Sequence, residues 1–124
     1  MPVHVAVDRS KKLVITTYSG DVTDADVADQ ISEIRKQAPY DPAYRAITDF
    51  TQVSQFNISS NEIRSVAESE SPLAEARRVM VAPSDLAYGT SRMFQMLASR
   101  TRPHITVVRT LGEAYAALGI DCAG

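Results

Sequence analysis

The chain has 124 residues, of which 44% are hydrophobic and 23% charged, and its formal net charge is −2. A chain of this length buries a core as one domain without disulfide or metal staples. The slightly acidic balance argues against nucleic acid as a partner, and no apolar run approaches the ~18–20 residues of a membrane span. Cys122 is the only cysteine, so no disulfide forms within the chain and we expect a cytoplasmic protein.

The N-terminal third predicts a hairpin and a helix. Residues 3–8 alternate apolar and polar side chains, residues 13–18 are rich in β-branched side chains, and a polar turn joins the two runs. Thr23 then begins a helix, with Asp26 in the position of an acidic capping partner, and Pro39 ends it. The helix carries one apolar stripe with the 3.6-residue period, formed by Val27, Ile31, Ile34 and Ala38.

The middle of the chain predicts a third strand and a second helix. Residues 45–50 form a short strand, and residues 51–57 are expected to be an irregular crossing segment. The second helix begins at Ser59, because Ser59 and Glu62 have the spacing of a capping box. It ends in the segment 69–72, which contains a proline.

The next stretch predicts a strand, a loop and a helix. Residues 78–82 are apolar on both alternating faces, as expected of a strand buried inside a sheet. Residues 83–89 break this pattern with turn residues, and Thr90 or Ser91 is the expected N-cap of the third helix. That helix is expected to turn three apolar side chains inward, namely Met93, Phe94 and Leu97.

The C-terminal part predicts a fifth strand over residues 104–109 and a fourth helix. A capping box formed by Thr110 and Glu113 begins this helix, and Gly119 suits a left-handed C-terminal cap. The full order is therefore ββαβαβαβα. It predicts a single α/β domain with a mixed, mostly parallel five-stranded sheet, four helices and right-handed crossovers. We expect the first strand to be antiparallel and to lie at an edge.

This element order resembles the STAS domain of anti-sigma factor antagonists, the SpoIIAA-like family. Several short segments also resemble a group of small uncharacterised bacterial STAS-like proteins. These segments are residues 20–23, 45–49, 81–83, 88–94 and 111–114 with 118–119. The resemblance implies a STAS-like fold and a non-enzymatic interaction or regulatory module.

The resemblance also implies a candidate phosphorylation switch. In STAS antagonists the third strand ends in Asp, and an Asp-Ser-x-Gly element at the second helix carries the serine that a partner kinase phosphorylates. Asp49 matches the strand-end acid, although an acid that hydrogen-bonds the following loop is the alternative. A gapless match places Asn57 on the motif Asp and Ile58 on the phospho-acceptor, and the motif glycine is missing. A slip of one residue makes Ser59 the candidate, with Ser60 beside it.

The loop before the third helix is the candidate binding site. Ligands of open α/β sheets bind beyond the carboxyl ends of strands, and a helix N-terminus favours an anion. The side chains that would ring a small anionic or polar ligand are Ser84, Tyr88, Thr90, Ser91 and Arg92. The alternative is that these residues only form a turn and cap the helix. The methionines Met80, Met93 and Met96 are either core filling or the wall of an apolar pocket for a lipid-like ligand.

The sequence offers no recognisable catalytic constellation. His4 and His104 each stand alone on a predicted strand, without partners at metal-ligand spacing, and no phosphate-loop or nucleophile-elbow pattern occurs. We therefore expect no metal or cofactor and name no catalytic residue, and an enzyme is the third hypothesis after the two that follow. The first hypothesis is a module that binds a partner protein or forms a homodimer through an unpaired sheet edge. The alternative is a carrier or sensor of a small anionic or apolar molecule with its site near residues 83–92.

Overall fold

The computed structural model describes residues 3–37, 43–69 and 73–120. Its elements follow the expected ββαβαβαβα order. They are β1 (Val3–Asp8), β2 (Leu13–Thr23), α1 (Asp24–Gln37), β3 (Arg45–Asn57), α2 (Ser60–Glu68), β4 (Arg78–Val81), α3 (Asp85–Leu97), β5 (Ile105–Val108) and α4 (Leu111–Leu118). The expected features at Ala38, Pro39, residues 70–72 and Cys122 lie outside the described residues.

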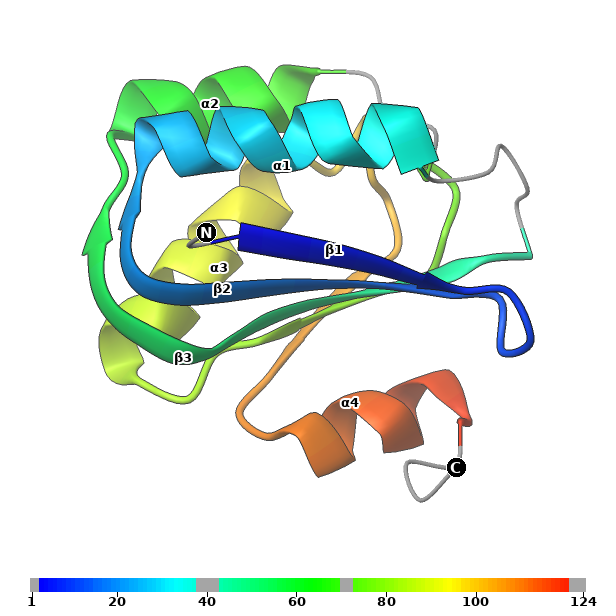
Figure 1. The fold of residues 1–124 in the computed structure, drawn as a ribbon. Helices are drawn as coiled ribbons and strands as arrows, with labels where there is room; N and C mark the ends of the chain where they lie inside the picture. Colours follow the sequence, from blue (N-terminus) through cyan, green and yellow to red (C-terminus); the bar gives the residue numbers. More distant parts are fainter. Residues whose placement is uncertain (1–2, 38–42, 70–72, 121–124) are drawn as a thin grey trace.

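The strands form one five-stranded sheet in the order β1-β2-β3-β4-β5 (Figure 1). β1 pairs with β2 antiparallel, and the other three pairings are parallel, so the predicted mixed sheet with an antiparallel edge strand is confirmed. β4 lies between β3 and β5, and all four of its residues are buried. Its apolar character on both faces therefore follows from burial on both sides of the sheet.

The helices cover the two faces of the sheet unequally (Figure 1). α1, α2 and α3 pack on one face, where Val27, Val66 and Ala98 join a buried cluster with Tyr18 and Met80 of the sheet. α4 packs on the opposite face, in a smaller cluster formed by Leu13, Ile47, Val79, Val81, Ala114 and Leu118. The face under three helices is the one that contains the site described below.

β2 and β3 are longer than the sequence pattern indicates. Residues 51–57, expected to be irregular, continue β3 and pair with the end of β2 as far as Thr23 with Asn57. Two register shifts interrupt this pairing, so the apolar side chains of β3 lose the period of two that marks a strand. Figure 1 shows both strands curling over the sheet at this end to reach α1 and α2. Gly20 supports the bend of β2 with a φ of 67°.

The N-cap of α3 lies six residues before Thr90 and seven before Ser91, the two expected caps. Ser84 is its N-cap, because the Ser84 hydroxyl accepts a hydrogen bond of 3.1 Å from the backbone N–H of Ala87. Gly89, which suggested a loop, lies inside the helix, where it lowers helix propensity without ending the helix.

This earlier start also changes the side of α3 that faces the core. Ala87 and Ser91 are buried, and Phe94 is partly buried against the same cluster. The expected inward position of Leu97 is wrong, since its side chain is 39% exposed, and Met96 is 68% exposed. The residues that face the core lie at i, i+4 and i+7 from Ala87, the spacing of one face of a helix.

The predicted helix caps agree with the structure at α2 and α4. Ser59 accepts from the backbone N–H of Glu62, and Thr110 with Glu113 forms a reciprocal capping box. Gly119 adopts a φ of 68°, as the left-handed C-terminal cap requires. Within the described residues, none of the helices has the length and apolar character needed to span a bilayer.

Candidate functional site

A cavity of about 80 Å³ lies between the sheet and α1, α2 and α3. The curled ends of β2 and β3 place α1 and α2 side by side over the sheet, and α3 closes the remaining side (Figure 1). Most of its lining is aliphatic or aromatic. The aliphatic part comprises Val27, Ile31, Ile34, Ile58, Ile63, Val66 and Met80.

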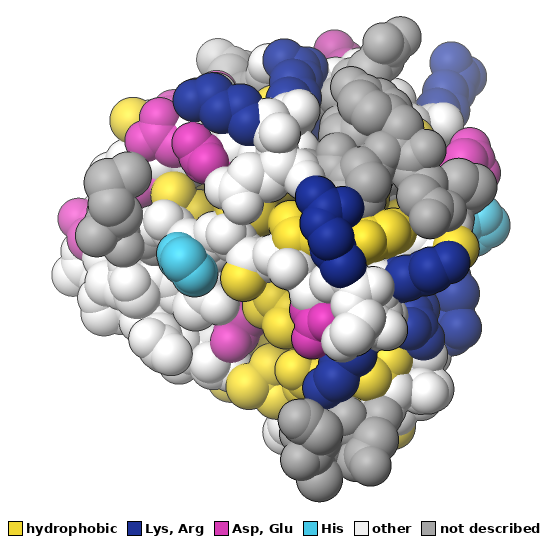
Figure 2. Space-filling model, turned by 45° about the vertical axis from the view of Figure 1, so that its right-hand side comes forward, with side chains coloured by type: hydrophobic (Ala, Val, Ile, Leu, Met, Phe, Trp, Pro, Cys, Tyr) yellow, Lys and Arg dark blue, Asp and Glu magenta, His cyan; other side chains and the backbone are white. Residues whose placement is uncertain are grey.

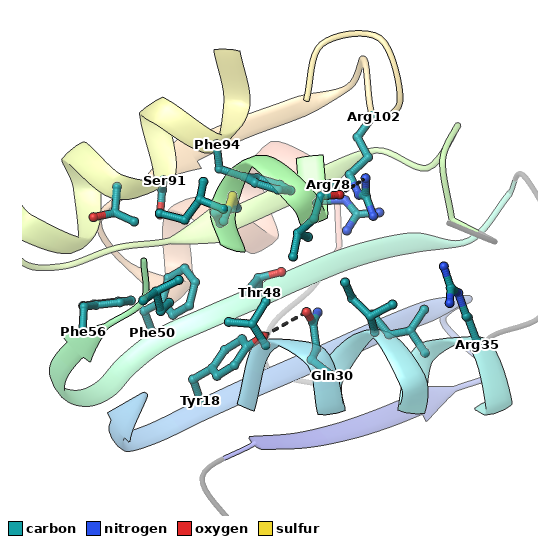
Figure 3. A pocket seen from close by; sticks show the side chains of 18 residues that line it. Tyr18, Gln30, Arg35, Thr48, Phe50, Phe56, Arg78, Ser91, Phe94 and Arg102 are labelled. Carbon is teal, nitrogen blue, oxygen red and sulfur yellow. Dashed lines mark hydrogen bonds between the residues drawn. The ribbon is translucent and has the colours of Figure 1, made fainter. Parts of the chain in front are cut away.

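Three aromatic rings form one end of this cavity (Figure 3). Tyr18 of β2 stacks on Phe50 of β3 with ring centroids 5.3 Å apart. Phe50 in turn meets Phe56 edge to face at 5.2 Å. Rings held in contact by their neighbours make a rigid apolar wall, which is a common feature of small-molecule sites.

A buried polar chain connects β2 to α1 beside these rings. The Tyr18 hydroxyl donates to Gln30 Oε1 at 2.9 Å, and Gln30 Nε2 donates to Thr16 Oγ1 at 3.3 Å. Burial, with the nearby negative charge of Asp26, raises the pKa of Tyr18 above its usual value. Tyr18 therefore remains a neutral hydroxyl donor at physiological pH.

Arg78 of β4 lines the cavity as a buried cation, with only 6% of its surface exposed. Its Nη2 donates to the carbonyl oxygen of Leu73 at 3.2 Å, whereas its Nε has no hydrogen-bond partner among the described residues. Burial, with the positive charge of Arg102, lowers the pKa of Arg78 to about 9. Arg78 is thus still charged at pH 7, in a place where a lone charge is costly.

Arg102 is also buried, and its Nε, like that of Arg78, has no hydrogen-bond partner among the described residues, but its Nη1 has several. Its Nη1 donates to the carbonyl oxygens of Val66 and Ser69 at 3.0 and 2.9 Å, at the C-terminal end of α2. The carbonyl end of a helix favours a cation, so these contacts offset part of the cost of burying Arg102. Its guanidinium also lies 5.8 Å from the centroid of the Phe94 ring. Burial and the charge of Arg35 lower the pKa of Arg102.

The positive charges of the cavity gather at one of its ends. Figure 3 shows Arg35, Arg78 and Arg102 at the end opposite the aromatic rings. The described lining includes these three arginines and no Asp or Glu. Figure 2, which turns the C-terminal end of α1 towards the viewer, shows a band of apolar side chains with Lys and Arg side chains across it and beside it. The cavity is thus apolar along its length and positive at one end.

The structure separates the five residues of the expected loop site. Thr90 and Ser91 line the cavity, and the buried Ser91 hydroxyl has no hydrogen-bond partner in the described part of the chain. Ser84 caps α3, and Tyr88 lies under the Arg109 guanidinium, 4.2 Å from its ring centroid. Arg92 is exposed on α3. The five side chains therefore do not surround one common site.

The residues implied by the STAS resemblance lie in two places. Ser59 and Ser60 are exposed at the start of α2, and the Ser59 hydroxyl donates to Asp24 Oδ2 at 2.8 Å. Asp49 is buried within β3, on the face away from the cavity, and accepts a hydrogen bond of 2.8 Å from the backbone N–H of Thr51. Because β3 continues to Asn57, Asp49 is not at a strand end.

Among known structures, the chain is similar to an uncharacterised protein of the DUF3478 family from Shewanella loihica PV-4, described as having a SpoIIAA-like fold. The two share 15% sequence identity with a TM-score of 0.59, over 94% of this chain and 93% of the other. The chain has the SpoIIAA-like fold. The fold expected from the STAS resemblance is therefore confirmed. No protein-family model and no curated protein sequence matches the chain.

Sequence reasoning missed the arginines of this SpoIIAA-like domain as site residues. The sequence contained one sign of Arg78. Positions 78, 80 and 82 lie on the same face of the strand, and Met80 and Ala82 on that face are buried in the core. A charge at such a position is rare unless it is paired. The described residues contain no group of three or more His, Cys, Asp or Glu that would hold a metal ion.

Proposed function

We propose that this protein binds a small, mostly apolar molecule in the cavity between the sheet and α1, α2 and α3. The observation that carries the proposal is a pair of buried polar atoms in residues that line the cavity, Ser91 Oγ and Arg78 Nε, which lack hydrogen-bond partners among the described residues. Buried polar groups in folded proteins are nearly always hydrogen-bonded, so such atoms call for a ligand or ordered water. An apolar cavity with a few convergent polar groups is the usual form of a small-molecule site.

The volume limits the size of the molecule. About 80 Å³ exceeds the ~10–15 Å³ that one water molecule needs, and it is roughly half of an engineered cavity of ~150 Å³ that binds benzene. The occupant of this volume as it stands is therefore smaller than benzene, and a six-carbon chain or a single ring also needs α1 and α2 to move apart. Separation of α1 from α2 would admit a longer chain.

Binding, rather than turnover, is the activity that this lining supports. A hydroxyl nucleophile needs a neighbouring base, and the described lining contains no His, Asp, Glu or Cys beside Ser91. We propose a carrier or sensor that acts in the cytoplasm, the compartment favoured by the single cysteine.

The test is a titration of the ¹⁵N-labelled protein with hexan-1-ol, followed by NMR. We expect chemical shift changes at cavity residues such as Ile31 and Ile63. Ser91→Leu should fill the cavity and abolish these changes, at a cost of about 1–3 kcal/mol in stability. Ser99→Leu, on the exposed side near the end of α3, is the matched control and should retain them. Absence of any change at cavity residues of the native protein, with short alcohols and single-ring compounds alike, would overturn the proposal.

A second candidate function is protein–protein interaction. Leu86, Met96 and Leu97 of α3 are exposed, with Leu86 at 62% and Met96 at 68%. Exposed apolar side chains on one helix favour contact with another surface. We propose a partner protein or a second copy as the alternative. Light scattering of the native protein and of Met96→Glu tests for the homodimer, and a monomer at high concentration in both would reject it.

As part of this second candidate function, we propose that phosphorylation of Ser59 or Ser60 regulates the interaction. Exposure of Ser59 and Ser60 at the start of α2 supports it. The helix N-terminus favours a phosphate, although the carboxylate of Asp24 opposes one on Ser59. Mass spectrometry of the protein purified from its own cells would detect the phosphate. Its consistent absence under stress would reject the switch.

A further inference from the structure

We infer that the molecule bound in the cavity is a monocarboxylate whose carboxylate group pairs with Arg78; this inference rests on the proposed function. Of the two buried arginines of the cavity, Arg78 makes fewer hydrogen bonds to the described residues than Arg102. It makes one hydrogen bond to the described residues, to the Leu73 carbonyl oxygen, and its buried Nε makes none.

The charge around Arg78 requires an anion. No carboxylate lies in the described lining, and Arg102 and Arg35 add positive charge at the same end. Arg102 is balanced by the carbonyl end of α2, whereas Arg78 has no carboxylate beside it in the described lining of the cavity. A buried cation is tolerated when an anion pairs with it, and Arg78 is one of the residues that line the cavity.

The shape of the guanidinium selects the chemical class. Arginine offers planar N–H groups in a fork that matches the two oxygens of a carboxylate. The rest of the ligand must then run along the apolar wall towards Tyr18, Phe50 and Phe56 (Figure 3). An apolar body with a carboxylate at one end fits this direction, and the cavity volume favours a short body.

The experiment compares hexanoate with hexan-1-ol, which has the same chain length and no charge, by isothermal titration calorimetry. We expect hexanoate to bind the native protein at least tenfold more tightly. Arg78→Met should remove this preference while hexan-1-ol still binds. Arg78→Lys keeps the charge without the fork, so it should retain a preference of only a few fold. Arg92→Met, exposed on α3, is the matched control and should keep the native preference.

The outcomes separate this inference from the proposed function. Equal affinities for hexanoate and hexan-1-ol in the native protein would overturn the carboxylate assignment and leave cavity binding intact. Failure of both compounds to bind would overturn the proposed function itself. A preference that survives Arg78→Met would show that another group holds the anion. Tighter binding of hexyl phosphate than of hexanoate would overturn the carboxylate class.

Arg78→Met changes a buried residue and could disturb folding, so a second measurement uses the native protein. Titration with hexanoate should shift the NMR resonance of the Arg78 Nε–H group, and titration with hexan-1-ol should leave it in place. An unchanged Nε–H resonance at saturating hexanoate would overturn the inference.

Discussion

The carboxylate of Asp24 at the start of α1 holds Ser59 at the start of α2. Its two oxygens accept hydrogen bonds of 2.7 Å from the Ser59 backbone N–H and 2.8 Å from the Ser59 hydroxyl. One side chain thus ties together the beginnings of the two helices that cover the cavity. Residues 35 positions apart in the sequence meet here because β2 and β3 curl over the sheet together.

Removal of this link should destabilise the fold. We expect Asp24→Ala to lower the free energy of unfolding by about 1–2 kcal/mol, since two charge-assisted hydrogen bonds at a partly exposed site are lost. Urea denaturation followed by circular dichroism measures this change. Asp29→Ala, exposed on the same helix, is the control and should fall within about 0.5 kcal/mol of the native protein. Equal losses in the two variants would contradict the role of Asp24.

A negative charge at position 59 should weaken the contact between Asp24 and residue 59. Ser59→Glu places a second carboxylate beside Asp24, so the two helix starts repel one another. We expect a loss of about 1–2 kcal/mol, and Asp24→Asn in the same chain should restore part of it. Ser60→Glu should be neutral or stabilising, because an acid in the first turn of a helix is favoured. Denaturation curves that rank the two variants in the opposite order would contradict the geometry.

The buried hydrogen bond between Tyr18 and Gln30 should contribute measurably to stability. Tyr18→Phe leaves Gln30 Oε1 without its donor, and a buried acceptor left unsatisfied costs about 1–3 kcal/mol. A double-mutant cycle with Gln30→Leu isolates the pairwise energy. A coupling energy near zero in thermal denaturation would show that the two side chains act independently.

Substitution of Arg78 should stabilise the ligand-free protein. We expect Arg78→Met to raise the free energy of unfolding at pH 7 by about 1–4 kcal/mol, because a buried charge with no carboxylate beside it in the described lining is replaced by an apolar side chain. The pKa of Arg78 is about 9 when folded and near its usual, higher value when unfolded. The native protein therefore releases this proton more readily than the unfolded chain, and its stability relative to Arg78→Met rises with pH above about 9.

The advantage of Arg78→Met is thus largest below pH 9 and shrinks above it. Thermal denaturation of both proteins at pH 7 and pH 10 measures the difference. A variant that is less stable than the native protein at pH 7 would show that the buried charge already has a counter-charge.

The Ser91 hydroxyl should be dispensable for folding. Ser91→Ala removes a buried group that has no partner among the described residues, so we expect the ligand-free protein to gain up to about 1 kcal/mol. Calorimetric melting temperatures measure this gain. A loss of more than 1 kcal/mol would indicate that Ser91 has a partner in the ligand-free protein, such as an ordered water.

The local chemistry of the chain predicts most of its elements. The capping sequences at Ser59 and Thr110 place helix starts correctly, and alternation in residues 3–8 places the edge strand. These signals succeed because each depends on a few neighbouring residues. Ser84 is also a local capping residue. The expected helix start is later, at Thr90 or Ser91, because Gly89 indicates a loop.

Features that depend on distant partners are not predictable in this way. The extension of β3 through residues 51–57 exists because β2 pairs with it, and the two register shifts hide its strand period. The cavity needs side chains from six helices and strands and from two residues outside them, Ile58 and Arg102, so no stretch of sequence reveals it. Arg78 is the exception, since a charge inside a buried strand is visible in the sequence alone.

Crystallisation of the protein with hexanoate tests the central claim most directly. The account predicts continuous electron density for one hexanoate inside the cavity, with the carboxylate within hydrogen-bonding distance of Arg78 and the chain directed towards Tyr18. A cavity that holds only ordered water, with hexanoate absent or confined to the surface, would contradict it.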